Sequence, residues 1–257
     1  MTARVAWISL TPVKATRLHV VDEVELTEAG VRGDRRFYLV DGNGRRVNCK
    51  DQGVLQLVRA DYDEAADVLV LRFPGGRVAE APVERGGEIE TTFGSQGPRL
   101  ARELVGPWSE ALSAYAGRPL RVVEPALPAQ DRGRSGAASL LSTGSLARIA
   151  GQLGVAAVDE RRFRMNFVLD GLEPHAEDGW LGRRVRLGEA AVIPQGNVGR
   201  CAITTQDPDR GVADLDTLKA LAAYRGDVET TEPLPFGVHA AVAEPGRVRV
   251  GDPVEVL

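Results

Sequence analysis

One cysteine of the chain stands in a segment that is suited to exposing a reactive thiol. Cys201 follows Gly199 and Arg200, so a flexible approach precedes a short predicted strand. Arg200 favours the thiolate electrostatically, and the thiolate is the form that attacks electrophiles and ligates soft metals. The alternative is a buried structural cysteine at the start of a strand, because free cysteine is among the residue types most often buried.

Cationic side chains that suit phosphate oxygens occur at several places along the chain. They are Lys14 after Pro12, the run Asp34–Arg36 and the run Arg161–Arg164. Guanidinium groups bind phosphate through paired hydrogen bonds, and the backbone amides at a helix N-terminus, predicted here at Ser142, also bind anions. Each feature taken singly is more often a solvated charge or an ordinary helix cap. An anion site is therefore predicted only if the fold brings these residues together.

Several common chemistries lack their motifs in this sequence. The three histidines are scattered at His19, His175 and His239, so residue spacing supports neither a four-ligand zinc site nor a cysteine protease. Neither G-x-G-x-x-G nor G-x-x-x-x-G-K-[ST] occurs, which removes the usual arguments for nucleotide binding. The formal net charge of -4 argues against nucleic acid as a partner.

Length and composition are those of a globular protein. The chain has 257 residues, of which 43% are hydrophobic and 26% are charged, enough for one large domain or two small ones. No apolar run approaches the roughly 18 residues of a membrane helix, and the first ten residues lack the features of a signal peptide. With only two cysteines, the sequence predicts a cytoplasmic protein without a membrane partner.

Many short strands and few helices, without regular βαβ alternation, predict an α+β, mainly β fold that is barrel-like. Helices are expected after Pro107, after Ser142 and near Leu215. A loop over 126–138 marks the predicted boundary between a smaller N-terminal β-rich domain, 1–125, and a second domain, 126–257. Strands are expected at 37–40, 45–48, 54–60, 68–73, 166–169, 185–187, 190–193, 201–204, 247–250 and 254–256.

Five separated motifs, taken in order, resemble the MOSC family. This family is named for the C-terminal domain of molybdenum-cofactor sulfurase, and the resemblance includes the N-terminal β-barrel domain that often precedes it. The family includes the amidoxime-reducing component of mitochondria and bacterial relatives, in which a cysteine ligates molybdenum held by a phosphate-bearing pterin dithiolene. The motifs are Thr11–Lys14, Gly33–Phe37, Arg162–Asn166, Gly199–Pro208 with the helix 217–225, and Pro245–Asp252.

The resemblance implies a role for individual residues. Cys201 would be the metal ligand and the catalytic residue, because a soft thiolate suits a molybdenum centre that already carries sulfur. Binding of pyridoxal phosphate is a further expectation for a protein of this kind. The residues implied in binding the pterin and its phosphate are Lys14, Arg35, Ser142, Ser145, Arg164, Asn166 and Arg200.

The activity implied by the resemblance is that of a molybdenum-cofactor-binding oxidoreductase that reduces N-hydroxylated or N-oxide compounds. No flavin or iron–sulfur motif lies in the chain, so a separate electron-donor protein is expected. His239 and Asp207 are candidates for delivering protons. Two other functions remain open: a cofactor or sulfur carrier that uses a persulfide on Cys201, and a cofactor-binding module without turnover.

This sequence departs from the reducing components at several positions. Those relatives often have Cys-Ser-Arg-Cys where this chain has Val198–Cys201, and serine where Ala15 stands. Met165 replaces a common proline, and Val238 replaces a glutamine. Because a hydroxyl and an amide are lost, the resemblance supports cofactor binding better than it supports a particular substrate.

Overall fold

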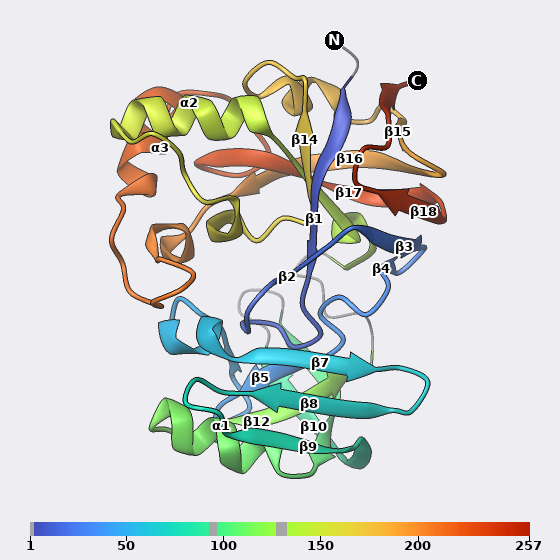
Figure 1. The fold of residues 1–257 in the computed structure, drawn as a ribbon, viewed down its shortest axis with the longest axis vertical. Helices are drawn as coiled ribbons and strands as arrows, with labels where there is room; N and C mark the ends of the chain where they lie inside the picture. The colour runs from blue at the N-terminus through green and yellow to red at the C-terminus, as the bar shows by residue number, and fades with distance from the viewer. Residues whose placement is uncertain (1–2, 93–96, 127–132) are drawn as a thin grey trace.

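The computed structural model describes residues 3–92, 97–126 and 133–257, which form the two stacked lobes of Figure 1. The lower lobe contains β5 (Tyr38–Val40), β6 (Arg46–Val47), η1 (Gly53–Leu57), β7 (Arg59–Asp63), β8 (Val68–Arg72), β9 (Val78–Pro82), β10 (Glu84–Thr92), β11 (Pro98–Val105), α1 (Trp108–Ala116) and β12 (Arg121–Pro125). The prefix η denotes a 3₁₀ helix.

The upper lobe combines the start of the chain with its second half. It contains β1 (Arg4–Leu10), β2 (His19–Val21), β3 (Glu23–Thr27), β4 (Gly30–Val31), η3 (Gly133–Gly136), β13 (Ala138–Ser142), α2 (Thr143–Leu153), η4 (Glu160–Phe163), β14 (Phe167–Asp170), η5 (Ala176–Trp180), β15 (Val185–Leu187), β16 (Ala190–Gly199), η6 (Ala202–Thr205), α3 (Thr217–Arg225), β17 (Pro235–Glu244), β18 (Gly246–Arg249) and β19 (Val254–Val256).

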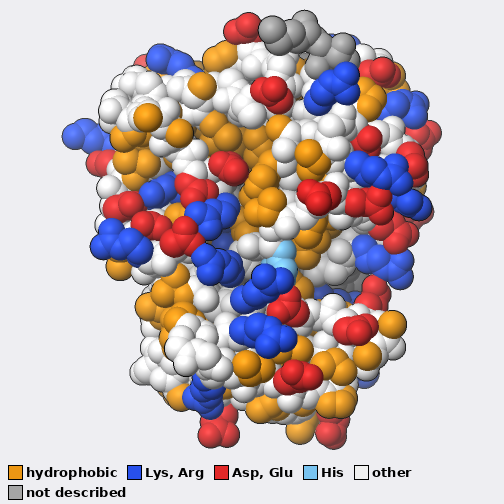
Figure 2. Space-filling model, in the orientation of Figure 1, with side chains coloured by type: hydrophobic (Ala, Val, Ile, Leu, Met, Phe, Trp, Pro, Cys, Tyr) orange, Lys and Arg blue, Asp and Glu red, His pale blue; other side chains and the backbone are white. Residues whose placement is uncertain are grey.

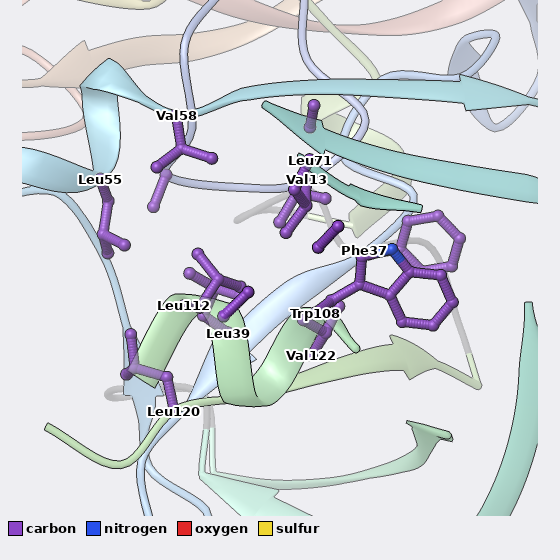
Figure 3. Close-up of a cluster of buried hydrophobic side chains, with 14 of the residues drawn as sticks. Val13, Phe37, Leu39, Leu55, Val58, Leu71, Trp108, Leu112, Leu120 and Val122 are labelled. Atoms are coloured by element: carbon purple, nitrogen blue, oxygen red, sulfur yellow. The ribbon is translucent and has the colours of Figure 1, made fainter. Parts of the chain in front are cut away.

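In its described residues, the lower lobe has two sheets, the α-helix α1 and the 3₁₀ helix η1 around a hydrophobic core. The sheets have the strand orders β10-β11-β12-β5-β6 and β7-β8-β9. In β8 the alternating residues Leu69 and Leu71 point inward, as the period of a half-buried strand requires. Figure 3 shows part of this core around Trp108, whose indole N–H donates to the Leu69 carbonyl oxygen at 2.8 Å. The predicted strand 68–73 and the predicted helix after Pro107 are confirmed.

The upper lobe centres on an eight-stranded sheet of order β19-β15-β16-β17-β13-β14-β1-β2. A smaller sheet, β18-β3-β4, joins the N-terminal strands to the end of the chain. Strands β13 and β14 run parallel with α2 as their crossover, a βαβ unit that the sequence pattern did not predict. Ser142 caps α2 as expected, because its side chain accepts from the Ser145 amide at 3.1 Å.

The strands between Arg4 and Val31 belong to the upper lobe, although the sequence pattern assigned them to the N-terminal domain. Strands β1 to β4 pair within the upper-lobe sheets, whereas the chain from β5 to β12 forms the lower lobe. Part of the expected loop 126–138 lies outside the described residues, and the rest contains η3 and the start of β13. The division at residue 126 stays a prediction. In the described ranges no helix is long and apolar enough to cross a membrane, and the cytoplasmic location also stays a prediction.

The mainly β, α+β fold class is confirmed, but one predicted strand is wrong in part and another is wrong as a whole. The strand expected at 54–60 begins only at Arg59, because η1 occupies Gly53–Leu57. The strand expected at 201–204 is the 3₁₀ helix η6. There the hydroxyls of Thr204 and Thr205 donate to the carbonyl oxygens of Cys201 and Ala202, three residues back, at 3.2 and 2.7 Å, which favours a tight turn over a strand ladder.

Candidate functional site

A cavity of about 250 Å³ lies between the two lobes and collects residues from both. Six cationic side chains line it, and no aspartate or glutamate does so within the described part of the chain. Figure 2 shows Lys and Arg side chains gathered at the waist where the lobes meet. A water-filled space with this lining attracts an anionic ligand. The six cations are Lys14, Arg35, Arg46, Lys50, Arg164 and Arg200.

Cys201 brings a thiol to the rim of this cavity. It lies two residues after the end of β16, its side chain is exposed, and it forms no disulfide. The backbone at Cys201 is extended, with φ −130° and ψ 178°, and its carbonyl oxygen accepts the Thr204 amide at 3.1 Å. The buried structural alternative for this cysteine is therefore wrong. A thiol in this position can reach a ligand inside the cavity.

Cys49 borders the same cavity but has a different environment. It is 1% exposed, and its Sγ donates to the Ala15 carbonyl oxygen at 2.9 Å. Burial raises the pKa of the Cys49 thiol, with the nearby Arg164 guanidinium acting in the opposite direction. Cys49 is thus a buried thiol held inside the structure, whereas Cys201 presents an exposed thiol at the same cavity. The role of Cys201 as metal ligand and catalytic residue stays a prediction.

Three positions that line the cavity have the left-handed backbone that side chains other than glycine rarely adopt. The φ angles are 85° at Ala15, 49° at Arg35 and 53° at Arg164. Such backbone conformations are energetically unfavourable and concentrate at functional sites, where the surrounding structure holds them. Their grouping around one cavity indicates that this region is shaped for a ligand.

The predicted phosphate ligands approach the cavity from three segments. Lys14 lies between β1 and β2 and is 8% exposed, Arg35 follows β4, and Arg164 ends η4. Arg35 donates to the Arg164 carbonyl oxygen at 2.8 Å, and Arg164 donates to the Thr16 carbonyl oxygen at 2.7 Å. Burial lowers the pKa of the Arg164 guanidinium. A cation that has lost this much hydration gains more from an anion than a solvated one does.

Asp34 holds this cationic group together, a role that the sequence did not reveal. Its carboxylate accepts the Thr11 amide and Asn166 Nδ2, both at 2.9 Å, and it forms an ion pair with Arg35. The Asp34 side chain is 3% exposed. Asp34 therefore ties β1, β14 and the segment after β4 to one another. The carboxylate between Gly33 and Arg35 is the signal that would have found it.

Asn166 and Arg200 line the cavity, yet most of their polar atoms bind the protein. Asn166 donates to Asp34 and to the Ser9 carbonyl oxygen, and its Oδ1 accepts from Ser139 at 3.0 Å. The Arg200 guanidinium donates to the carbonyl oxygens of Phe236 and Phe163 and stacks over both rings. The Arg200 contacts hold the end of β16, and the Asn166 contacts join Ser9, Asp34 and Ser139, so both residues shape the site. Direct contact with a cofactor stays a prediction for both.

Ser142 and Ser145 lie apart from the cavity, in a buried cluster with Glu177. Glu177 Oε1 accepts the Ser142 amide at 3.2 Å and the Ser145 hydroxyl at 3.0 Å. The protein's own carboxylate thus occupies the N-terminus of α2, where an anion is favourable. Burial raises the pKa of Glu177. Both serines are fully buried, and their cofactor-binding role stays a prediction.

The two candidate proton donors also differ in position. His239 lines the cavity, and its Nδ1 lies 2.7 Å from the Ser135 carbonyl oxygen. Asp207 is not among the lining residues. Its carboxylate accepts the Asp209 amide, and its carbonyl oxygen accepts the Gly211 amide, both at 2.8 Å. Asp207 therefore shapes a turn, and His239 is the better-placed candidate.

His175 makes the stability of the upper lobe sensitive to pH. Burial, together with Arg225 and Arg148, lowers the pKa of His175 to about 4, whereas an unfolded histidine titrates near about 6.5. The fold therefore holds the neutral ring, and its contribution is complete above pH 6.5 and is lost as the pH falls towards 4. Between pH 6.5 and pH 4 the free energy of unfolding should therefore fall less in His175→Asn than in the wild type. Urea unfolding at the two pH values measures this difference. Asparagine tolerates the local φ of 62°. Equal slopes in both proteins would contradict this.

The lining of the cavity fits a phosphate-bearing cofactor whose metal needs one protein ligand. In residues 3–92, 97–126 and 133–257, no group of three or more His, Cys, Asp or Glu side chains could hold a metal ion by itself. One exposed thiol at a cavity also lined by Lys14, Arg35 and Arg164 instead offers one soft metal ligand and several phosphate donors. This donor set suits a metal that arrives with its own sulfur ligands.

The chain matches two family models that divide the sequence between them. The MOSC N-terminal beta barrel domain matches residues 2–101, and the MOSC domain matches residues 130–255. The fold and the site thus define a two-part MOSC protein. The chain belongs to the MOSC family, and the resemblance stated from its sequence motifs is confirmed.

Curated relatives with similar sequences are amidoxime-reducing components. The mitochondrial amidoxime reducing component 2 of Bos taurus is 28% identical over 95% of this chain and 80% of that protein. The human component 1 is 27% identical over 98% and 82%. The match to the mouse component 1 is 37% identical but spans only 39% of this chain and 31% of that protein. The crystal structure of the YUAD protein from Bacillus subtilis gives a TM-score of 0.49 at 14% identity, covering 100% of this chain and 96% of that one.

Proposed function

We propose that the chain binds a molybdenum cofactor in the cavity between its lobes and reduces N-hydroxylated or N-oxide compounds. The observation that carries the proposal is the exposed Cys201 thiol at a cavity lined by cations from both lobes. The relatives named as amidoxime-reducing components support the substrate class. Electrons come from a separate donor protein, as the sequence predicts.

Each part of the site has a task in this proposal. Lys14, Arg35 and Arg164 hold the phosphate, and the Cys201 thiolate ligates the metal. When bound, the cofactor supplies two-electron oxygen-atom transfer. His239, with one ring nitrogen fixed by the Ser135 carbonyl oxygen, is positioned to hold a proton at the cavity wall. Pyridoxal phosphate, which also carries a phosphate, stays a predicted ligand of the same cations.

The carrier function is the second candidate, because an exposed thiol such as Cys201 can also accept sulfur as a persulfide. The two functions differ in the state of that thiol. A thiolate that ligates a metal is protected from alkylation, whereas a carrier cysteine must remain nucleophilic and accessible.

One experiment separates these functions. The protein is purified from a host that makes the cofactor, and its molybdenum is measured by elemental analysis. Oxidation of reduced viologen is then followed with an amidoxime and with an N-oxide, and iodoacetamide labelling of Cys201 is mapped by mass spectrometry. We expect about one molybdenum per chain, turnover and a protected Cys201. A persulfide or rapid labelling without turnover would favour the carrier, and bound molybdenum without turnover would favour the binding module.

A further inference from the structure

The segment that follows Cys201 belongs to the upper lobe in sequence but is held by the lower lobe. Ile203, two residues after the cysteine, packs against the hydrophobic core of the lower lobe. Gln56, which is 1% exposed in η1, donates from Nε2 to Gln206 Oε1 at 2.7 Å. An apolar contact and a partly buried hydrogen bond therefore join the two lobes just beyond the thiol.

Two glycines bring the backbones of the two lobes together at the end of this segment. A Cβ atom on Gly53 would lie 1.9 Å from the Gly211 carbonyl oxygen, and one on Gly211 would lie 2.5 Å from the Gly53 carbonyl oxygen. Gly211 also has a φ of 67°. No other residue type fits at either position without moving one lobe, so the lower lobe covers the backbone next to Arg210.

Cys201 lies between two anchors that belong to different lobes. On one side the Arg200 guanidinium binds the Phe236 and Phe163 carbonyl oxygens of the upper lobe. On the other side Ile203 and Gln206 bind the lower lobe. Ile203 lies within the short helix η6, only two residues after Cys201, so a shift of the second anchor moves the thiol relative to the cavity cations.

We propose that Ile203 and Gln206 are positioning residues, through which the lower lobe holds Cys201 at the cavity. The proposal rests on the proposed function for its metal, but the contact itself exists without a cofactor. Removing the contacts of Ile203 and Gln206 with the lower lobe is expected to loosen the segment after Cys201 and to expose the Arg210–Gly211 peptide bond. It is also expected to weaken the binding of the metal by the Cys201 thiolate. A ligand displaced by even about 1 Å loses much of its effect.

The test compares substitutions that remove the contact with conservative substitutions that keep most of it. Ile203→Ala removes the apolar anchor, and Ile203→Val restores most of it. Gln206→Ala removes the acceptor, and Gln206→Glu keeps an oxygen in reach of Gln56. The matched control is Leu112→Ala, which weakens the same lower-lobe core from α1, away from the segment.

Two measurements on the apo protein need no cofactor. They are the rate of trypsin cleavage after Arg210 and the rate of Cys201 alkylation by iodoacetamide. We expect cleavage to be at least about tenfold faster, and alkylation at least about threefold faster, in Ile203→Ala and Gln206→Ala than in the wild type. The valine, glutamate and Leu112 variants should keep wild-type rates under native conditions.

A third measurement uses the holoprotein, in which the two alanine variants should retain less than about half of the wild-type molybdenum after dialysis. Unchanged cleavage and alkylation in both alanine variants would overturn the proposal, as would an equal effect in Leu112→Ala. Faster cleavage with unchanged alkylation and molybdenum would also overturn it, because the contact would then not position the thiol. A wild type without molybdenum would refute the proposed function, and the alkylation rates would still decide this inference.

Discussion

Cys201→Ala is expected to abolish bound molybdenum and all reduction of N-hydroxylated compounds while leaving the fold intact. Its side chain is exposed, so the substitution removes no core packing. Within the described residues no cluster of His, Cys, Asp or Glu offers the metal an alternative site. In the proposed site the Cys201 thiolate is the one metal bond that the protein contributes, so we expect no neighbouring ligand to compensate for its loss.

Elemental analysis, viologen oxidation and thermal unfolding of the purified variant measure this effect. Cys49→Ala is the matched control, because it removes the other cysteine that borders the cavity. Its buried thiol bonds the Ala15 carbonyl oxygen, so this variant should lose a little stability and keep its molybdenum. Full molybdenum and full activity in Cys201→Ala would show that the metal ligand is assigned wrongly.

The elements that could be predicted from the sequence are those fixed by local patterns. The strand at 68–73 and the start of a helix after Pro107 depend on a few adjacent residues, and the structure has β8 and α1 at these places. Four residues that line the cavity could be predicted only from the order of the five motifs: Lys14, Arg35, Arg164 and Cys201. Taken singly, a lysine, an arginine or a cysteine is too common to indicate a site.

The features that the sequence missed depend on contacts between distant segments. The strand expected at Cys201 becomes η6 because Ile203 packs into the lower lobe and the threonine hydroxyls bond back along the chain. The helix N-terminus at Ser142 looked like a phosphate site until the fold placed Glu177 against it. The lower-lobe core that Ile203 contacts and the Glu177 carboxylate at Ser142 are both distant in the sequence, so no local pattern could predict these contacts.

Asp34 shows how such a partner can determine the whole site, and Asp34→Asn is the second variant with a large expected effect. An asparagine keeps the shape and can still accept the Thr11 amide. The asparagine lacks the negative charge opposite Arg35. Towards Asn166 it presents either an amide N–H₂ group, which cannot accept, or an amide oxygen, which is a weaker acceptor than a carboxylate. Because the pair is buried, we expect the free energy of unfolding of the apo protein to fall by about 3 to 5 kcal/mol.

The same substitution should also empty the site, since Arg35 is oriented by Asp34 and faces the cavity. Urea unfolding of the apo protein and the molybdenum content of the holoprotein measure the two effects. Glu64→Gln is the matched control, because it breaks the ion pair with Arg32, whose side chains are 59% and 55% exposed. An exposed pair contributes about 1 kcal/mol or less, so this variant should keep its cofactor. If Asp34→Asn lowered the free energy of unfolding no more than Glu64→Gln does, the Asp34 carboxylate would not be the group that holds the cavity cations in place. The orientation of Arg35 towards the cavity would then have to come from its hydrogen bond to the Arg164 carbonyl oxygen.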